Sequence, residues 1–292
     1  MIELKRVRTA PPIHKNFYGE KRIAANLKLL KQKKAGELEA GGEKKWDSSF
    51  WKESKDQLLV ESNNKCAYCE TPTKVVDYGD VEHFRPKSIY WWLAYCYENY
   101  LPSCAICNQK YKKDAFDLED ETLQLKGPNL TNLTEAQLTA LAPKLTVDPV
   151  DKTGGKDLEE FKAELVAEKA LLINPYFEDP SLYFAYQPIL ENKEIVVVPA
   201  KAKYKKVIKA CEDFFGINRQ ELLDLRFQLY CLYMTYRHTL ADPGISANTR
   251  TMNQNRLTQM SAGISPYAGM IRYFDTKDLD DLPWDFNIQI NF

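Results

Sequence analysis

Two Cys-x-x-Cys pairs constrain the fold of this chain more than any other feature of its sequence. Cys66 and Cys69 form the first pair, Cys104 and Cys107 form the second, and thirty-four residues separate the pairs. Four thiolates complete the tetrahedral coordination that zinc prefers, and such a site leaves no position open for water. The spacing therefore predicts a structural zinc ion that joins the two ends of segment 66–107 and holds the residues between them as a closed loop.

The remaining cysteines and the apolar runs indicate the class of protein. Cys96, Cys211 and Cys231 lie in apolar stretches, which predicts buried, unreactive thiols. Seven cysteines behind an N-terminus without a signal-like apolar stretch argue against a disulfide-bonded secreted protein. The longest apolar run, Ile89 to Tyr97, has nine residues, far below the roughly 18 that a membrane span requires. We therefore expect a cytoplasmic protein without a membrane segment.

The charge of the chain is nearly balanced. Forty basic and forty-one acidic residues give a net charge of −1 at pH 7, so the protein as a whole does not attract a polyanion. Residues 21–34 are an exception, with six basic residues, no acidic residue, and Ile23, Leu27 and Leu30 on one helical face. We expect an amphipathic helix there, whose basic face is either simply solvated or in contact with phosphate.

Helix-capping pairs mark where several helices should begin. The pairs are Thr134 with Gln137, Asp157 with Glu160, and Asn218 with Glu221. The second pair predicts a helix to about residue 170, and the third opens the clearest helix, to about residue 240. The apolar residues of that last helix recur at helical spacing, which predicts a stripe buried in the core. This stripe consists of Leu222, Leu225, Leu229, Leu232 and Tyr236.

The remaining patterns complete the expected organisation. A helix is expected over residues 53–64, with Leu58 and Leu59 inward, and a strand over residues 194–198. We predict an α+β fold, mainly helical, in three parts. These are an N-terminal arm with the basic amphipathic helix (1–50), a compact zinc-bound module (51–118), and a loop-rich insertion followed by a mainly helical C-terminal region (119–292).

The closed loop carries residues suited to phosphodiester hydrolysis. Glu82 and His83 are adjacent, and Asn108 follows the last cysteine at the start of a basic segment. Hydrolysis requires a base for a water proton and a divalent cation that stabilises charge on the phosphate. An imidazole titrates near pH ~6.5 and can act as the base. Glu82 and Asn108 offer the oxygen ligands that magnesium or manganese prefers. The alternative for His83 is a buried histidine without a chemical role.

The geometry of a strand raises one objection to this site. Adjacent residues of a regular strand point to opposite faces, so Glu82 and His83 share a site only where the strand ends. Pro86 follows closely and indicates that it ends there.

The order of these motifs resembles the HNH endonuclease family, whose catalytic module has a ββα-metal fold. It is similar in particular to the PtuB-like HNH proteins of the Septu anti-phage system, also found beside some retrons. The segments that carry this resemblance are Cys-Ala-Tyr-Cys-Glu (66–70), Glu-His-Phe-Arg-Pro-Lys (82–87) and Glu-Asn-Tyr-Leu-Pro-Ser-Cys (98–104), with 168–175 and 215–222 downstream. The chain departs from the pattern at Asp117, where Pro is commoner, and in one additional residue after Asn108. The third HNH position is Asn108 instead of His, which is a common variant.

The resemblance implies a metal-dependent endonuclease that hydrolyses nucleic acid, with DNA favoured over RNA. It implies the nuclease effector of a Septu-like defence system, acting with a partner ATPase of the PtuA type. Asn99 would orient the loop that carries His83, which adds Asn99 to the expected catalytic residues His83, Glu82 and Asn108. The candidates for contacts to the nucleic-acid backbone are Arg85, Lys87 and Lys112.

Two other classes of protein share the cysteine pairs. A non-catalytic zinc module that only binds nucleic acid or protein would not need Glu82, His83 and Asn108 together. A redox-active dithiol protein would carry little zinc when it is purified under reducing conditions. The first of these is the main alternative to a nuclease.

Overall fold

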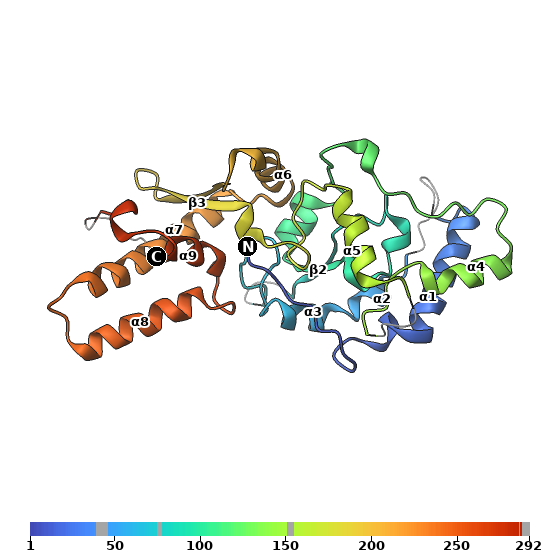
Figure 1. Cartoon of the computed structure of the whole chain (residues 1–292), viewed down its shortest axis with the longest axis horizontal. Helices are drawn as coiled ribbons and strands as arrows, with labels where there is room; N and C mark the ends of the chain where they lie inside the picture. The colour runs from blue at the N-terminus through green and yellow to red at the C-terminus, as the bar shows by residue number, and fades with distance from the viewer. Residues whose placement is uncertain (39–45, 75–77, 151–154, 286, 288–292) are drawn as a thin grey trace.

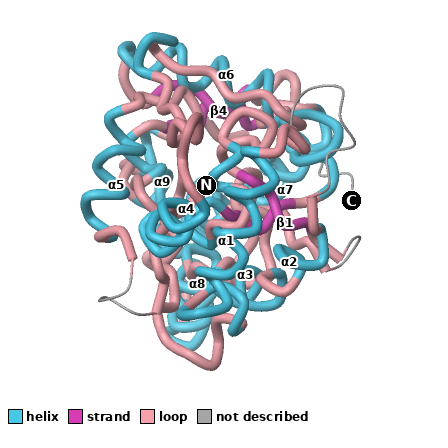
Figure 2. The backbone as a smooth tube through the Cα atoms, turned by 90° about the vertical axis from the view of Figure 1, so that its right-hand side faces the viewer, coloured by secondary structure: helices cyan, strands magenta, loops and turns pink. Residues whose placement is uncertain are grey.

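The computed structural model describes residues 1–38, 46–74, 78–150, 155–285 and 287. Helices dominate, and the strands are short and lie among helices and loops (Figure 2). The elements up to α5 lie on one side of the molecule, the C-terminal helices lie on the other, and the N-terminus lies between them (Figure 1). Within the described residues, no helix combines the length and apolar character needed to cross a lipid bilayer.

The described residues form α-helices of different lengths and two pairs of strands. The α-helices are α1 (Gly19–Lys34), α2 (Ser48–Lys52), α3 (Lys55–Glu61), α4 (Glu135–Leu141), α5 (Leu158–Ala167), α6 (Lys205–Phe215), α7 (Gln220–Ala241), α8 (Ala247–Ser261) and α9 (Ala268–Asp275). The strands are β1 (Asp80–His83), β2 (Tyr100–Ser103), β3 (Phe184–Ile189) and β4 (Glu194–Pro199). The pairs β1–β2 and β3–β4 are both antiparallel. The predicted mainly helical fold and the strand over 194–198 are confirmed.

Strand β1, strand β2 and a helix follow one another within residues 80–112, around the second cysteine pair. In the register of β1 and β2, Glu82 lies opposite Leu101 and His83 lies opposite Tyr100. The strand β1 ends at His83, as expected from Pro86. The helix that follows, Ile106–Lys112, is a π-helix, whose hydrogen-bonded turn holds one residue more than an α-helical turn.

Capping was predicted correctly for two helices and wrongly for the third. Thr134 and Gln137 form a reciprocal capping box on α4. Asp157 accepts hydrogen bonds from two backbone amides at the start of α5, which ends three residues before the predicted end near 170. Asn218 does not cap α7. Its side chain bonds the backbone N (2.8 Å) and O (3.0 Å) of Val197 on β4, so it connects the helix entrance to the hairpin.

The predicted core stripe of α7 is also wrong in part. Leu222 is buried, but Leu225 and Leu232 are 42% and 43% exposed. The buried residues of the helix are Leu222, Leu223, Arg226, Phe227, Tyr230, Cys231, Tyr233 and Met234. Because this helix has apolar residues on all of its sides, the periodicity of its sequence does not indicate which face is buried. Packing against β4, α8 and α9 selects it.

The basic helix α1 is present, but its buried face is more polar than expected. Leu30 is buried, whereas Ile23 and Leu27 are half-buried. Arg22 turns inward and donates a hydrogen bond of 2.7 Å to the carbonyl of Thr146. Lys31 pairs with Glu135 at 2.6 Å on the outer face. These internal partners favour the solvated alternative for the basic face over a contact to phosphate.

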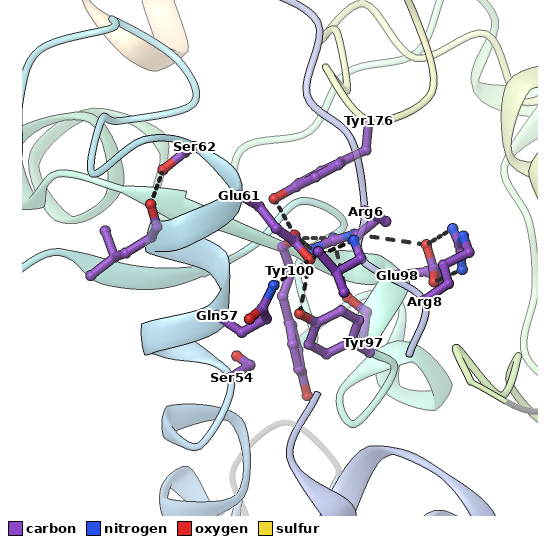
Figure 3. A network of polar contacts seen from close by, with 12 residues as sticks. Arg6, Arg8, Ser54, Gln57, Glu61, Ser62, Tyr97, Glu98, Tyr100 and Tyr176 are labelled. Carbon is purple, nitrogen blue, oxygen red and sulfur yellow. Dashed lines mark hydrogen bonds and ion pairs between the residues drawn. The ribbon is translucent and has the colours of Figure 1, made fainter. Parts of the chain in front are cut away.

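The N-terminal arm joins the expected module to the C-terminal region. The Arg6 guanidinium lies over the Tyr176 ring at 3.6 Å and pairs with Glu61 at 3.2 Å, and Glu98 lies beside it (Figure 3). One apolar core extends from Met1 to Leu282 and draws residues from all three expected parts. The three parts therefore pack together around one core.

Candidate metal centre and catalytic cleft

The four cysteines of the two pairs come together in the interior. Their sulfur atoms all lie within 4.8 Å of one another, and all four residues are buried. Cys69 Sγ and Cys104 Sγ are 4.0 Å apart. Zinc–sulfur bonds of about 2.3 Å in a tetrahedron place sulfur atoms about 3.8 Å apart. The four thiols can therefore hold one metal ion.

Local backbone bonds shape each pair into a turn. Cys66 accepts the amide of Glu70 at 3.0 Å, and Glu70 has a φ of 61° that closes the turn. Cys104 accepts the amide of Asn108 at 3.0 Å at the start of the π-helix. The amide of Ala67 donates to the carbonyl of Pro102 at 2.8 Å, which holds the first turn against β2.

The C-terminal region covers this centre. Phe215 stacks on Tyr68, with ring centroids 3.8 Å apart. Arg219 Nη1 lies 3.6 Å from Cys107 Sγ, where its charge favours the thiolate form of the cysteine. Both residues belong to segment 215–222, one of the segments that carry the family resemblance. The spacing of the cysteines carries no signal for Arg219, which was not predicted.

The other three cysteines are buried, as predicted. Burial raises the pKa of the Cys96 thiol to about 12 and that of the Cys231 thiol to about 11. These thiols stay protonated near neutral pH, and this form is a poor nucleophile.

A cleft of about 270 Å³ opens beside β1 and the π-helix. It brings together four predicted site residues, Glu82, His83, Lys87 and Asn108. The other lining residues are Trp51, Lys52, Lys55, Asp80, Val81, Pro86, Gln109, Lys113 and Asp114. Asn99, Arg85 and Lys112 do not line it.

His83 is held as a neutral imidazole at the wall of the cleft. Its Nε2 lies 3.0 Å from the carbonyl oxygen of Ala94, which can only accept, so Nε2 carries the proton and Nδ1 carries the lone pair. The rings of Trp51 and Tyr100 meet it edge-on at 4.9 and 5.1 Å. Burial, with the charge of Lys87, lowers the pKa of His83 to about 3. The imidazole is therefore a free base at neutral pH.

Asn99 holds the backbone just after His83. Its Oδ1 accepts from the amide of Arg85 at 2.9 Å, and its Nδ2 donates to the carbonyl of Arg85 at 2.9 Å. A second bond from Nδ2 reaches the carbonyl of Leu93 at 3.3 Å. These contacts fit the orienting role that the resemblance implies.

Glu82 and Lys112 are partners of each other. Lys112 Nζ lies 2.6 Å from Glu82 Oε1 and donates to the carbonyl of His83 at 3.2 Å, and the Lys112 side chain is fully buried. Burial raises the pKa of Glu82, and the charge of Lys112 opposes that shift. Lys112 is thus out of reach of phosphate in this structure, and the carboxylate of Glu82 already has a cationic partner.

Asp80 is a cleft residue that the sequence motifs did not indicate. Its Oδ2 accepts from Asn108 Nδ2 at 3.1 Å and from Gln109 Nε2 at 2.8 Å. It lies two positions before Glu82, so both belong to the same face of β1. This two-residue spacing in the sequence could have indicated that Asp80 lies beside Glu82.

Arg85 was a candidate for a phosphate contact, and the structure places it in the interior instead. It is 2% exposed, its Nε pairs with Glu168 at 2.7 Å, and its Nη2 donates to the carbonyl of Leu165 at 2.7 Å. Tyr90 shares the same carboxylate at 2.5 Å. Arg85 therefore joins the segment after β1 to the end of α5, and its guanidinium is not accessible to phosphate.

Replacing Glu168 with Gln should destabilise the whole protein, because it leaves the buried charge of Arg85 without a partner. We expect a loss of about 3–5 kcal/mol in the free energy of unfolding, measured by urea titration. Glu159→Gln removes an exposed pair with Lys162 on the same helix and should cost at most about 1 kcal/mol. Equal midpoints for the two variants would contradict the structural role of this ion pair.

The fold and site define a mainly helical protein with two small sheets, a buried four-cysteine centre and an adjoining cleft that holds His83. Over 185 residues, 59% of this chain and 49% of the relative, it is 29% identical to the Septu protein PtuB of Bacillus mycoides strain KBAB4. It is also 50% identical to the Septu protein PtuB of Bacillus thuringiensis over 54 residues, 18% of this chain and 21% of that relative.

These matches confirm the similarity to Septu PtuB proteins that the motifs indicated. It spans about half the length of the first relative and about a fifth of the second. No protein-family model and no solved structure matches the chain.

Proposed function

We propose that this chain is a metal-dependent, HNH-type endonuclease that hydrolyses phosphodiester bonds of nucleic acid, with DNA favoured over RNA. The observation that carries the proposal is the neutral imidazole of His83, held by Ala94 at the wall of a polar cleft. The strand, strand and helix around it have the order of the ββα-metal fold. The similarity to two Septu PtuB proteins supports a nuclease subunit of a Septu-like anti-phage system, acting with a PtuA-type ATPase.

We assign zinc to the four-cysteine centre. Four buried thiols at tetrahedral spacing fit zinc and leave no position for water or substrate, which makes the ion structural. A redox-active pair would instead need an accessible thiol. The burial of all four sulfurs therefore favours zinc over the dithiol alternative.

In the cleft, the proposed base is His83, whose Nδ1 would accept the proton of the attacking water. Magnesium or manganese, when bound, would stabilise negative charge on the phosphate. The Asp80 carboxylate and the Asn108 amide oxygen are hard ligands that line the cleft and fit such a cation. Because Glu82 is paired with Lys112, we assign it to holding that buried lysine. This assignment replaces Glu82 by Asp80 as the carboxylate ligand.

A non-catalytic zinc module remains the second candidate. Within the described part of the chain, the four cysteines form the one group of three or more His, Cys, Asp or Glu ligands that could share an ion. This observation favours a binding role without a catalytic cation. Cleavage of DNA that requires magnesium or manganese, by the protein isolated from its own cells with any bound partner, distinguishes the two candidates.

The two carboxylates of β1 should respond differently to metal. Asp80→Asn should weaken the affinity for the catalytic cation by at least roughly 10-fold, so raising magnesium or manganese should recover part of the cleavage rate. Glu82→Gln should lower the thermal midpoint, because Lys112 loses its buried partner, and should leave the metal dependence unchanged. The measurement is cleavage rate against metal concentration. If instead Glu82→Gln were rescued by metal and Asp80→Asn were not, Glu82 would be the ligand.

A further inference from the structure

We propose that four lysines around the cleft bind the phosphate groups of the nucleic-acid backbone on either side of the position that His83 faces. These rim lysines are Lys52, Lys55, Lys87 and Lys113. The inference rests on the proposed function, from which it takes nucleic acid as the ligand. Among the four, the motifs had indicated Lys87 alone.

The rim lysines lack the ion pairs that several other lysines make in the described part of the chain. Among the residues that the structure describes, none of the four has an acidic group within ion-pair distance. Several lysines elsewhere are paired with acidic residues: Lys28 with Asp47, Lys31 with Glu135, Lys65 with Glu70, Lys112 with Glu82, Lys162 with Glu159 and Lys209 with Asp213. Four ammonium groups without a carboxylate partner, gathered at one opening, form a site for a polyanion.

The acids of the cleft do not cancel this charge. Glu82 is neutralised by Lys112, which leaves Asp80 and Asp114 among the lining residues. Four positive charges against two negative charges leave a local excess of two, in a protein whose net charge is −1. A catalytic cation held by Asp80 would increase that excess.

The rim lysines come from separate parts of the chain, so they surround the opening. Lys52 ends α2 and Lys55 begins α3, both before the first cysteine pair. Lys87 lies beyond β1, with its ammonium 5.5 Å from the Trp51 ring. Lys113 follows the π-helix with a φ of 50°, a backbone conformation that is uncommon for a residue with a side chain. Contacts from several sides can hold backbone phosphates flanking the one at His83.

The test measures binding in a background that leaves the nucleic acid intact. In the full-length chain carrying His83→Ala, the triple variant Lys52→Gln, Lys55→Gln and Lys113→Gln is compared with a control, Lys110→Gln, Lys205→Gln and Lys206→Gln. The control lysines are exposed and lie outside the cleft, and both variants change the net charge equally. Anisotropy of labelled duplex and single-stranded DNA is recorded over a range of salt concentrations.

For the rim variant, the affinity should depend less steeply on salt. The magnitude of the negative slope of log affinity against log salt should decrease by about 2.7 with duplex DNA and by about 2.1 with single strands, because each lost phosphate contact removes about 0.9 or about 0.7. The control variant should keep the slope of its parent. Equal slopes for the two triple variants would overturn the inference. Binding with the expected change of slope, by a wild-type chain that does not cleave with magnesium or manganese, would uphold the inference and reject the nuclease.

Discussion

Replacing His83 should lower the rate of phosphodiester cleavage by roughly 10²- to 10⁴-fold, the usual contribution of a general base. His83→Gln is the sharper variant, because its amide can still donate to the carbonyl of Ala94 but cannot accept the proton of water at neutral pH. His83→Ala also removes the ring that packs against Trp51 and Tyr100, so it should in addition melt at a lower temperature.

The measurement is cleavage under single-turnover conditions with saturating manganese, beside thermal melts and zinc content for each variant. His14→Ala is the control, since His14 lies outside the cleft at 3.7 Å from Glu53. It should cleave like the wild type. A folded His83→Gln protein that cleaves at the wild-type rate would show that the buried histidine has only a structural role.

Replacing one ligand of the four-cysteine centre should unfold the protein. We expect about one zinc ion per chain in the wild type. The Cys104→Ser variant should lose both this zinc ion and the cooperative thermal transition. Structural zinc can contribute on the order of 10 kcal/mol to folding, which is comparable to the whole stability of a typical domain, about 5–15 kcal/mol. Because Phe215 and Arg219 pack on the centre, the loss should extend into the C-terminal region.

Elemental analysis and circular dichroism test this expectation, and Cys231→Ala, a buried cysteine outside the centre, is the control. The control should keep its zinc and a single transition, at a midpoint lowered by a small cavity. Folded wild-type protein without zinc, prepared under reducing conditions, would favour the dithiol alternative instead.

The shared core also changes the expectation for a truncated chain. If the module folded independently, a fragment 1–156 would keep its chemistry. In the structure, that fragment lacks Glu168, the buried partner of Arg85, as well as Phe215 and Arg219 on the metal centre. We therefore expect residues 1–156 to be insoluble or unfolded when they are expressed alone.

Several features followed from the sequence because their causes are local. Each Cys-x-x-Cys pair closes its own turn, so residue type and spacing were enough to predict that the four thiols meet. The capping box of α4 and the Asp157 cap of α5 lie within three residues of the bonds they make. His83, Glu82 and Asn108 were also predicted to share a site, and they line the same cleft.

The partners of charged side chains were decided only by the tertiary structure. Arg85 binds Glu168, 83 residues further along the chain, and Lys112 at the end of the π-helix binds Glu82 on β1, so neither is exposed to phosphate. The buried face of α7 likewise depends on which neighbours cover it. A charged or apolar residue gains free energy from whatever packs against it, and sequence spacing does not record contacts that distant segments make. The sequence by itself determined which chemical groups this protein brings to its centre and its cleft, and the fold decided which of them remain free to act.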